Sequence, residues 1–133
     1  KEALSIAKKN ALDNKTNITF IESDMTTYKD KLYDVIISNP PYISYEESIM
    51  ELVKNNEPHL ALYAKDNGLY FYKKIIDNIK YITKDKYLIC FEIGYNQSTA
   101  IVDYAKSKLT NINIYVEKDY SLKDRFIFIT NIN

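Results

Sequence analysis

Residues 33–42 of the chain read Tyr-Asp-Val-Ile-Ile-Ser-Asn-Pro-Pro-Tyr. Val35, Ile36 and Ile37 form a short, unbroken β-branched run, which predicts a buried, parallel strand over residues 33–38. The last four residues of the stretch follow the carboxyl end of this strand, where open α/β sheets bind ligands. The stretch therefore predicts an α/β fold with a site at residues 39–42.

These four residues predict a rigid bend that is rich in hydrogen-bond acceptors. Pro40 and Pro41 have fixed φ angles and no backbone donors, and each proline keeps the residue before it out of the α region. Asn39 offers a side-chain carbonyl, Pro40 a backbone carbonyl and Tyr42 a flat ring. Two acceptors and a stacking ring suit a planar NH₂ group. A turn that merely ends the strand is the alternative interpretation.

The rest of the sequence alternates helical and strand patterns. Apolar spacing predicts helices at residues 2–14, 69–81 and 97–109, and strands at residues 18–22, 33–38, 87–93, 112–116 and 125–130. We expect a turn at Asp85-Lys86 and an irregular segment over residues 43–65. This order predicts one α/β domain, residues 1–133, whose mostly parallel sheet is covered on both faces and ends in an antiparallel hairpin.

Composition narrows the class of protein. The 133 residues include 18 Lys+Arg and 18 Asp+Glu, which gives a net charge of zero and argues against direct nucleic-acid binding by this chain. No apolar run approaches membrane-spanning length and no signal peptide is visible, so we expect a cytoplasmic protein without membrane contact. The single cysteine, Cys90, cannot form an internal disulfide, and no residues have metal-ligand spacing.

Six segments carry further motifs. They are Glu-Ser-Asp at 22–24, Ile-Ser-Asn-Pro-Pro-Tyr-Ile at 37–43, Asn-Glu-Pro-His-Leu-Ala-Leu at 56–62, Asp-Asn-Gly-Leu-Tyr-Phe-Tyr at 66–72, Phe-Glu-Ile-Gly-Tyr-Asn-Gln at 91–97, and Lys-Asp-Tyr at 118–120 with Asp-Arg at 124–125. Together they resemble the C-terminal three-fifths of the catalytic domain of the release factor glutamine N5-methyltransferases. Those enzymes use S-adenosylmethionine and have a Rossmann-like fold, which the resemblance implies here.

The resemblance implies roles for the bend. Asn39 and the Pro40 carbonyl would hold the nitrogen of a glutamine amide, Pro41 would complete the rigid motif, and Tyr42 would stack on the amide. Asn39 would also lie near the methionine part of the cofactor. The implied reaction is methyl transfer to the glutamine of a Gly-Gly-Gln tripeptide in class 1 release factors.

Other site residues also follow from the resemblance. Asp24 and Met25 would line the adenine pocket, and Glu57 and Pro58 would lie in the segment that closes over the substrate. From the residues alone, a turn is the favoured interpretation of Asp24, since Ser-Asp favours loops. Asp119 and Arg125 are expected to pair across the terminal hairpin.

Part of the family pattern is missing. The sequence has only two glycines, Gly68 and Gly94, far apart, so it contains no Gly-rich cofactor loop. The acidic residue that binds the ribose in the family, and the family's N-terminal helical domain, also have no counterpart. We therefore expect a fragment that binds cofactor poorly. The family's missing strands lie beside the strand at 33–38, so we expect another chain, or a rearranged strand, to cover its open edge.

Three alternatives remain open. The motif at residues 39–42 is shared with adenine-N6 DNA methyltransferases, and a ribosomal-protein glutamine methyltransferase has a similar pattern. The segments at 56–62 and 91–97 favour a protein-glutamine acceptor, and the hairpin favours the release factor branch. The third alternative is a non-catalytic α/β interaction module in which the proline bend is only structural.

Overall fold

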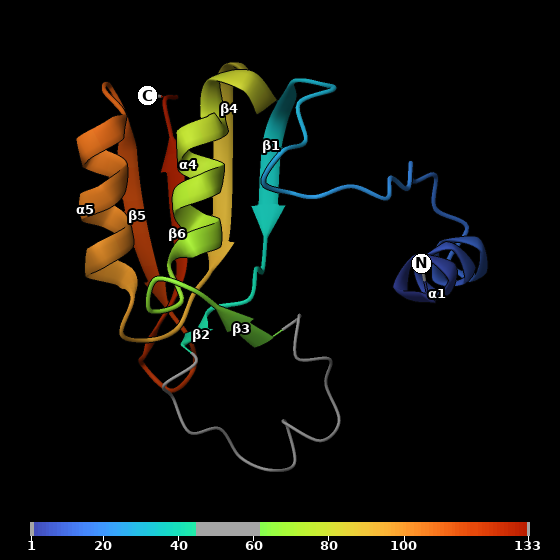
Figure 1. The fold of residues 1–133 in the computed structure, drawn as a ribbon, viewed down its shortest axis with the longest axis horizontal. Helices are drawn as coiled ribbons and strands as arrows, with labels where there is room; N and C mark the ends of the chain where they lie inside the picture. Colours follow the sequence, from blue (N-terminus) through green and yellow to red (C-terminus); the bar gives the residue numbers. More distant parts are fainter. Residues whose placement is uncertain (1, 45–61, 133) are drawn as a thin grey trace.

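The computed structural model describes residues 2–44 and 62–132 (Figure 1). The elements are α1 (Glu2–Asp13), β1 (Tyr33–Ser38), β2 (Ile43–Ser44), β3 (Tyr63–Ala64), α4 (Tyr70–Ile82), β4 (Thr83–Glu92), α5 (Ser98–Lys108), β5 (Asn113–Lys118) and β6 (Asp124–Thr130). The helices predicted at 2–14, 69–81 and 97–109 and the strand predicted at 33–38 are confirmed. The described chain is thus the expected α/β alternation.

Four strands form the main sheet, in the order β1-β4-β6-β5. β1 pairs with β4 in parallel, whereas β6 is antiparallel to both β4 and β5. The terminal hairpin is therefore confirmed. Of the four described strands in this sheet, β1, β4 and β5 run in the same direction and β6 runs against them, as expected for a mostly parallel sheet that ends in an antiparallel hairpin. Strand β6 returns through a short loop and lies between β4 and β5.

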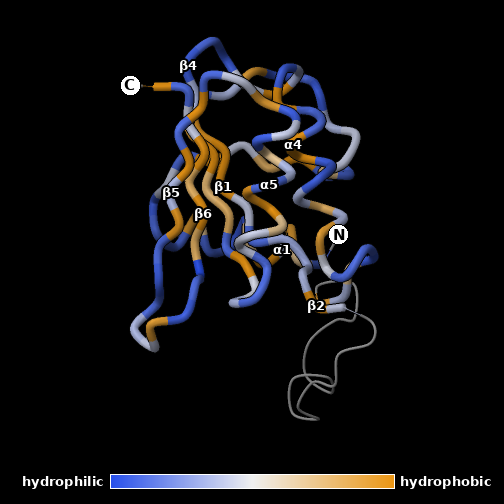
Figure 2. Tube along the Cα trace, turned by 90° about the vertical axis from the view of Figure 1, so that its left-hand side faces the viewer, coloured by the Kyte–Doolittle hydropathy of each residue, from blue (hydrophilic) through white to orange (hydrophobic). Residues whose placement is uncertain are grey.

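Helices α4 and α5 lie together on one face of the sheet (Figure 1). Alternate residues of β4 and β6 point into this layer, and the middle segments of the strands are the most apolar parts of the trace (Figure 2). The core residues are Tyr72, Ile75, Ile76, Ile79, Ile82, Tyr87, Ile89, Phe91, Ile93, Ile101, Ala105, Ile127 and Ile129. This two-layer packing fixes the carboxyl ends of β1 and β4 side by side.

The other sheet face is open in the described structure. Val35 and Ile37 are 50% and 80% exposed, and Tyr115 and Phe126 are also exposed. The expectation of helices on both faces is therefore wrong for these residues. The crossovers β1-α4-β4 and β4-α5-β5 step across the sheet in the same direction, so their common right-handedness puts both helices on one face. Figure 1 shows α1 lying apart from the sheet.

The strand predicted at residues 18–22 is absent. This segment has no strand assignment, and Ile18 and Ile21 are exposed. A strand needs a neighbour to satisfy its backbone donors and acceptors, and no described strand pairs with this segment. The following loop is nevertheless attached to the body, because the Asn78 side chain donates a hydrogen bond to the Thr26 carbonyl at 3.1 Å.

Strand β4 begins earlier than the sequence suggests. Tyr33 pairs with Thr83, and Val35 pairs with Leu88, so β4 carries three extra residues between these two pairs. The predicted turn at residues 85–86 is therefore wrong, because this irregularity in β4 absorbs the polar residues within the strand. Lys84 projects from it and forms an ion pair with Asp34 at 2.7 Å.

Candidate active site at the end of strand β1

The bend at residues 39–42 leaves the carboxyl end of β1, as predicted. Pro40 is buried, Tyr42 is half-buried and Asn39 is exposed. Within the described part of the chain, the Asn39 side chain makes no hydrogen bond. Its amide therefore stands at the surface on a rigid support, with its acceptor oxygen available to a ligand.

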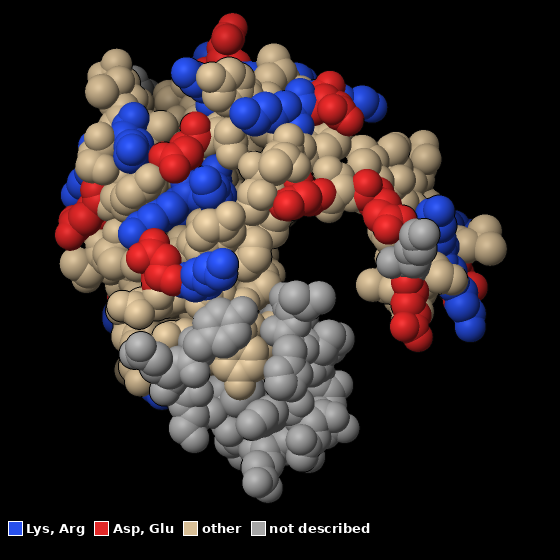
Figure 3. All heavy atoms as spheres, in the orientation of Figure 1, with Lys and Arg blue, Asp and Glu red and all other residues tan. Residues whose placement is uncertain are grey.

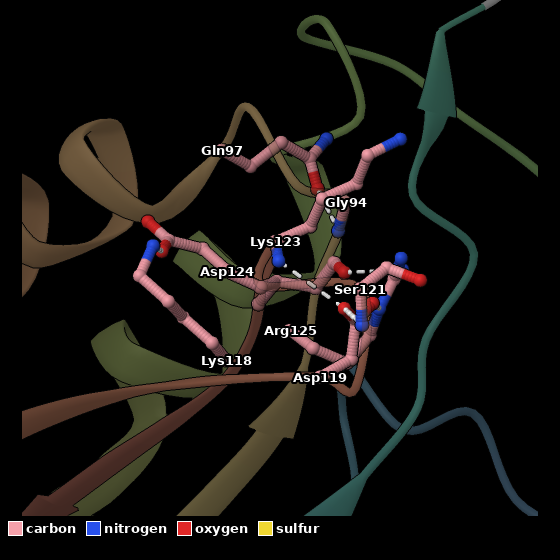
Figure 4. A network of polar contacts seen from close by, with 9 residues as sticks. Gly94, Gln97, Lys118, Asp119, Ser121, Lys123, Asp124 and Arg125 are labelled. Carbon is pink, nitrogen blue, oxygen red and sulfur yellow. Dashed lines mark hydrogen bonds and ion pairs between the residues drawn. The ribbon is translucent and has the colours of Figure 1, made fainter.

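The backbone of Tyr42 is held by a buried glutamine. The Gln97 Nε2 atom donates hydrogen bonds to the carbonyl oxygens of Tyr42 at 2.9 Å and Asn67 at 3.3 Å. The Gly94 N–H donates to Gln97 Oε1 at 3.0 Å (Figure 4). One side chain thus joins the segment after β1, the turn before α4 and the turn after β4.

Two glycines allow this close packing. Gly68 has a φ of +81°, and a side-chain carbon there would overlap the Tyr42 carbonyl and Gln97 Nε2. A side-chain carbon at Gly94 would lie 3.0 Å from Gln97 Oε1 and 3.4 Å from Tyr42 Cδ2. Gly68 lies in the turn before α4, where its positive φ and the lack of space for a side-chain carbon both require a glycine.

A cavity of about 240 Å³ opens beside Tyr42. Its lining consists of Tyr42, Ile43, Gly94, Tyr95, Asn96, Gln97 and Arg125. The predicted Asp119–Arg125 pair is confirmed at 3.2 Å, and Arg125 Nη1 also donates to the Ile93 carbonyl at 3.0 Å. These contacts hold the Arg125 guanidinium at the cavity wall, and Figure 4 shows Arg125 next to Asp119.

The environment of Asp119 favours its ionised form, which pairs with Arg125. Its carboxylate accepts hydrogen bonds from the backbone N–H groups of Ser121 and Lys123. The hydrogen bond from the Lys123 N–H, followed by those from Arg125 and Ser121, keeps the pKa of Asp119 below its usual value. The ion pair therefore persists through the neutral pH range.

A second cavity, of about 390 Å³, lies between the segment at residues 19–25, β1 and α4. Its lining consists of Thr19, Ile21, Ser23, Met25, Tyr28, Tyr33, Ile36, Ile37, Ser38, Ile75 and Ile82, none of which is charged. Met25 thus faces a cavity, as its predicted role requires. Asn39 lies in the chain between Ser38, which lines this cavity, and Tyr42, which lines the other.

Asp24 has a local structural contact. Its Oδ1 accepts hydrogen bonds from the Thr26 N–H at 2.8 Å and the Thr26 hydroxyl at 2.7 Å. The hydrogen bond from the Thr26 backbone lowers the pKa of Asp24. This geometry is that of the turn that was the alternative interpretation of this residue, and the cofactor role remains a prediction. Glu57 and Pro58 lie outside the described residues.

The surrounding surface has mixed charge. Over the α4–α5 face, lysines alternate with acidic residues (Figure 3), as in the Lys73–Asp66 pair at 2.7 Å and the Lys108–Asp77 pair at 3.7 Å. In the described residues, no group of His, Cys, Asp and Glu could hold a metal ion. No helix there has the length and apolarity needed to span a membrane.

Comparison with known proteins shows which family model the sequence matches and which solved structure has a similar fold. The family model described as "Methyltransferase small domain" matches residues 1–63. A solved protein-(glutamine-N5) methyltransferase (release factor-specific) from Alicyclobacillus acidocaldarius has a similar fold, with a TM-score of 0.52 and 21% identity over 77% of this chain and 50% of that one. The family model thus relates residues 1–63 to methyltransferases, and the solved structure shows that the fold is similar.

Curated relatives narrow the class further. Release factor glutamine methyltransferases from Lactococcus lactis and Bacillus subtilis are 38% and 39% identical to it over 97% and 96% of this chain. Over nearly its whole length, the chain is therefore similar to release factor glutamine methyltransferases. It spans about half the length of these relatives, 48% and 46% respectively.

Sequence reasoning found the bend but assigned no role to Gln97. The residue is the only glutamine in the chain, and it lies between a strand-ending glycine segment and a helix. That position was a usable signal, since a glutamine at the start of a helix is not a preferred capping residue. Its partners, however, are 55 and 30 residues away in sequence.

Proposed function

We propose that this chain supplies the acceptor-binding part of a protein-(glutamine-N5) methyltransferase. Its acceptor is the glutamine side-chain amide of the Gly-Gly-Gln motif in peptide chain release factors. The observation that carries the proposal is the exposed Asn39 amide, without a hydrogen bond among the described residues, on a bend that also presents Tyr42 to a cavity. In the cell, this activity belongs in the cytoplasm.

The bend would act by positioning and polarising the acceptor. Asn39 Oδ1 and the Pro40 carbonyl accept the two N–H bonds of the amide, and the Tyr42 ring stacks on its plane. The hydrogen bonds return electron density to a nitrogen that is otherwise delocalised. Each contributes about 1 kcal/mol, whereas orientation toward an electrophile can contribute up to roughly 7–11 kcal/mol. Positioning is therefore the larger contribution.

The methyl donor in this proposal is S-adenosylmethionine, which supplies an electrophilic sulfonium methyl group. Met25 and the uncharged cavity beside β1 suit a flat, weakly polar group such as adenine, and Asp24 lies in the chain between Ser23 and Met25, which both line this cavity. Asn39 lies between this cavity and the one beside Tyr42. The residues present would thus bring the methionine end of the cofactor close to the acceptor nitrogen.

We expect S-adenosylmethionine to bind weakly to the chain as it stands. The sequence contains two glycines, Gly68 and Gly94, and therefore no Gly-x-Gly loop to approach the cofactor backbone. Isothermal titration calorimetry with the 133-residue chain should give no saturation at micromolar concentrations. A micromolar Kd for S-adenosylmethionine would contradict the expectation that this chain binds the cofactor weakly.

The ligand that binds at the bend distinguishes the proposed function from its alternatives. We would titrate the ¹⁵N-labelled chain with a Gly-Gly-Gln peptide, a matched Gly-Gly-Glu peptide and adenosine. The Gly-Gly-Gln peptide should perturb resonances around residues 39–42 more strongly than the Gly-Gly-Glu peptide, which lacks the NH₂ group. A response to adenosine alone would favour the adenine-N6 alternative, and no response to any ligand would favour a structural bend.

Other parts of the proposal concern the acceptor protein. Glu57 and Pro58 are proposed to close over the release factor segment, and residues 1–133 are proposed to form part of the catalytic domain. A ribosomal-protein glutamine is the second candidate acceptor. Titration with the Gly-Gly-Gln peptide and with a glutamine peptide of unrelated sequence separates the two, since only the release factor proposal requires the diglycine.

We also predict self-association through the open edge of β1. Val35 and Ile37 are exposed there, and among the described strands only β4 pairs with β1. Association of two copies through this edge would bury these exposed apolar side chains.

Sedimentation velocity tests this prediction. The chain should associate with increasing concentration, and Ile37→Lys should shift the population toward monomer, since an edge lysine opposes strand pairing. Leu12→Lys, at an exposed position on the distant helix α1, is the control. A wild-type chain that stays monomeric at high concentration would contradict self-association.

A further inference from the structure

We propose that Gln97 is a positioning residue for the acceptor amide, an inference that rests on the proposed function. Its side chain fixes the segment that carries Tyr42 against the turn before α4 and the turn after β4, and the second of these turns lines the cavity. It acts through Tyr42 and does not itself touch the reacting atoms.

Gln97 uses its full amide. Its nitrogen donates to two carbonyls, its oxygen accepts one N–H, and the residue is only 6% exposed. A buried amide with all these partners has one orientation, because turning it over would place donors against donors and acceptors against acceptors. The side chain is therefore a rigid link between three segments of the chain.

Helix capping does not explain these contacts. Gln97 occupies the N-cap position of α5, but its side chain makes no capping hydrogen bond to that helix. The side chain turns away from α5 toward Gly94, and Figure 4 shows the amide facing that residue. The hydrogen bonds of the Gln97 side chain are thus made to segments around the candidate site and not to helix α5.

The two glycines of the sequence both stand beside this amide. A side-chain carbon at Gly68 would overlap Gln97 Nε2, and one at Gly94 would lie 3.0 Å from Gln97 Oε1. The space around the amide is therefore shaped by residues that have no side chain. The Tyr42 ring also lies beside Gly94, since the same carbon at Gly94 would lie 3.4 Å from Tyr42 Cδ2.

Gln97 therefore fixes one wall of the cavity. The Tyr42 carbonyl accepts a hydrogen bond from Gln97 Nε2, the Tyr42 ring lies beside Gly94, and all three residues line the same cavity of about 240 Å³. Loss of the amide would free the Tyr42 backbone to move away from Gly94. The ring would then no longer present a fixed plane for stacking.

Asn131 provides a matched control. Its Oδ1 accepts a hydrogen bond from the Tyr87 N–H at 3.0 Å, and its Nδ2 donates to the Asp85 carbonyl at 2.6 Å. Like Gln97, it is a side-chain amide that accepts one backbone N–H and donates to a backbone carbonyl far away in sequence, although both of its partners lie in β4. It lies toward the amino end of β4, whereas the candidate site lies beyond the carboxyl end.

The test compares Gln97→Leu, Gln97→Glu and Asn131→Ala in the full 133-residue chain. Gln97→Glu keeps an acceptor for the Gly94 N–H but cannot donate to the Tyr42 carbonyl when ionised. Two readouts are measured by NMR: the nuclear Overhauser effect between the Tyr42 ring and Gly94, and the Kd for the Gly-Gly-Gln peptide. Thermal unfolding of each variant reports stability separately.

We expect both Gln97 variants to lose the Tyr42–Gly94 effect and to bind the peptide about fivefold or more weakly, as for the loss of one hydrogen bond. Asn131→Ala should lower the unfolding temperature without changing either readout. Should Gln97→Leu fail to fold, Gln97→Glu decides. The inference is overturned if the Gln97 variants keep both readouts, or if Asn131→Ala changes them equally.

The two levels of the proposal fail in different ways. If the wild-type chain binds no peptide, the proposed function fails, while the Tyr42–Gly94 effect still tests whether Gln97 fixes the wall. If the wild-type chain binds the peptide and the Gln97 variants bind it equally well, the positioning role fails alone.

Discussion

Gly68→Ala should lower the free energy of unfolding by about 2–4 kcal/mol, a large effect for one added methyl group. Two costs combine. The φ of +81° is unfavourable for any residue with a side-chain carbon, and this carbon would overlap the Tyr42 carbonyl and Gln97 Nε2. Neither neighbour can move freely, because they are hydrogen-bonded to each other. Urea unfolding followed by circular dichroism measures the change.

Two controls separate these costs. Asn67→Ala introduces an alanine at a φ of +51° and should lose only about 1 kcal/mol, because Asn tolerates the left-handed region better than Ala. Gly94→Ala places its carbon 3.0 Å from Gln97 Oε1, a tight contact without backbone strain. If Gly68→Ala is as stable as the wild-type chain, the close packing around the Tyr42 carbonyl is wrong.

Asn39→Ala should produce the largest effect on acceptor binding. The substitution removes one of the two proposed acceptors for the amide N–H bonds, and we expect the Kd for the Gly-Gly-Gln peptide to rise about fivefold to thirtyfold. Asn39→Asp retains an acceptor oxygen and should lose less. Heteronuclear NMR titration measures both values.

Stability provides the internal check on this result. Asn39 is exposed and its side chain has no hydrogen bond among the described residues, so Asn39→Ala should leave the unfolding transition within about 0.5 kcal/mol of the wild-type value. Asn14→Ala, at the exposed end of α1, should change neither binding nor the site. Equal peptide affinity in the Asn39→Ala and wild-type chains would leave the bend with a purely structural role.

Local patterns in the sequence predicted the elements that position the site. The β-branched run at Val35–Ile37 gave β1 with its observed bounds, the spacing of Tyr72, Ile75 and Ile79 gave α4, and the short loop after residue 118 gave the antiparallel hairpin. Each depends on residues that are close in sequence. The bend at residues 39–42 followed in the same way, because proline restricts its own backbone and that of its neighbour.

Features set by distant pairing were not predictable. Residues 18–22 have strand-forming side chains but no partner among the described strands, so β-propensity alone gave a wrong prediction of a strand there. The early start of β4 depends on its irregular register against β1. The role of Gln97 depends on carbonyls far away in sequence, and only the folded chain brings them to one side chain. Helix coverage of the sheet depended on the direction of both crossovers.

Contact between the bend and a glutamine amide is the central claim. The most direct measurement is an isotope-filtered nuclear Overhauser experiment between the ¹³C,¹⁵N-labelled chain and an unlabelled Gly-Gly-Gln peptide. The account predicts contacts from the glutamine side-chain NH₂ protons to the Tyr42 ring and to Asn39, and their loss in Asn39→Ala. Peptide contacts confined to other residues, or the same contacts from a Gly-Gly-Glu side chain, would contradict it.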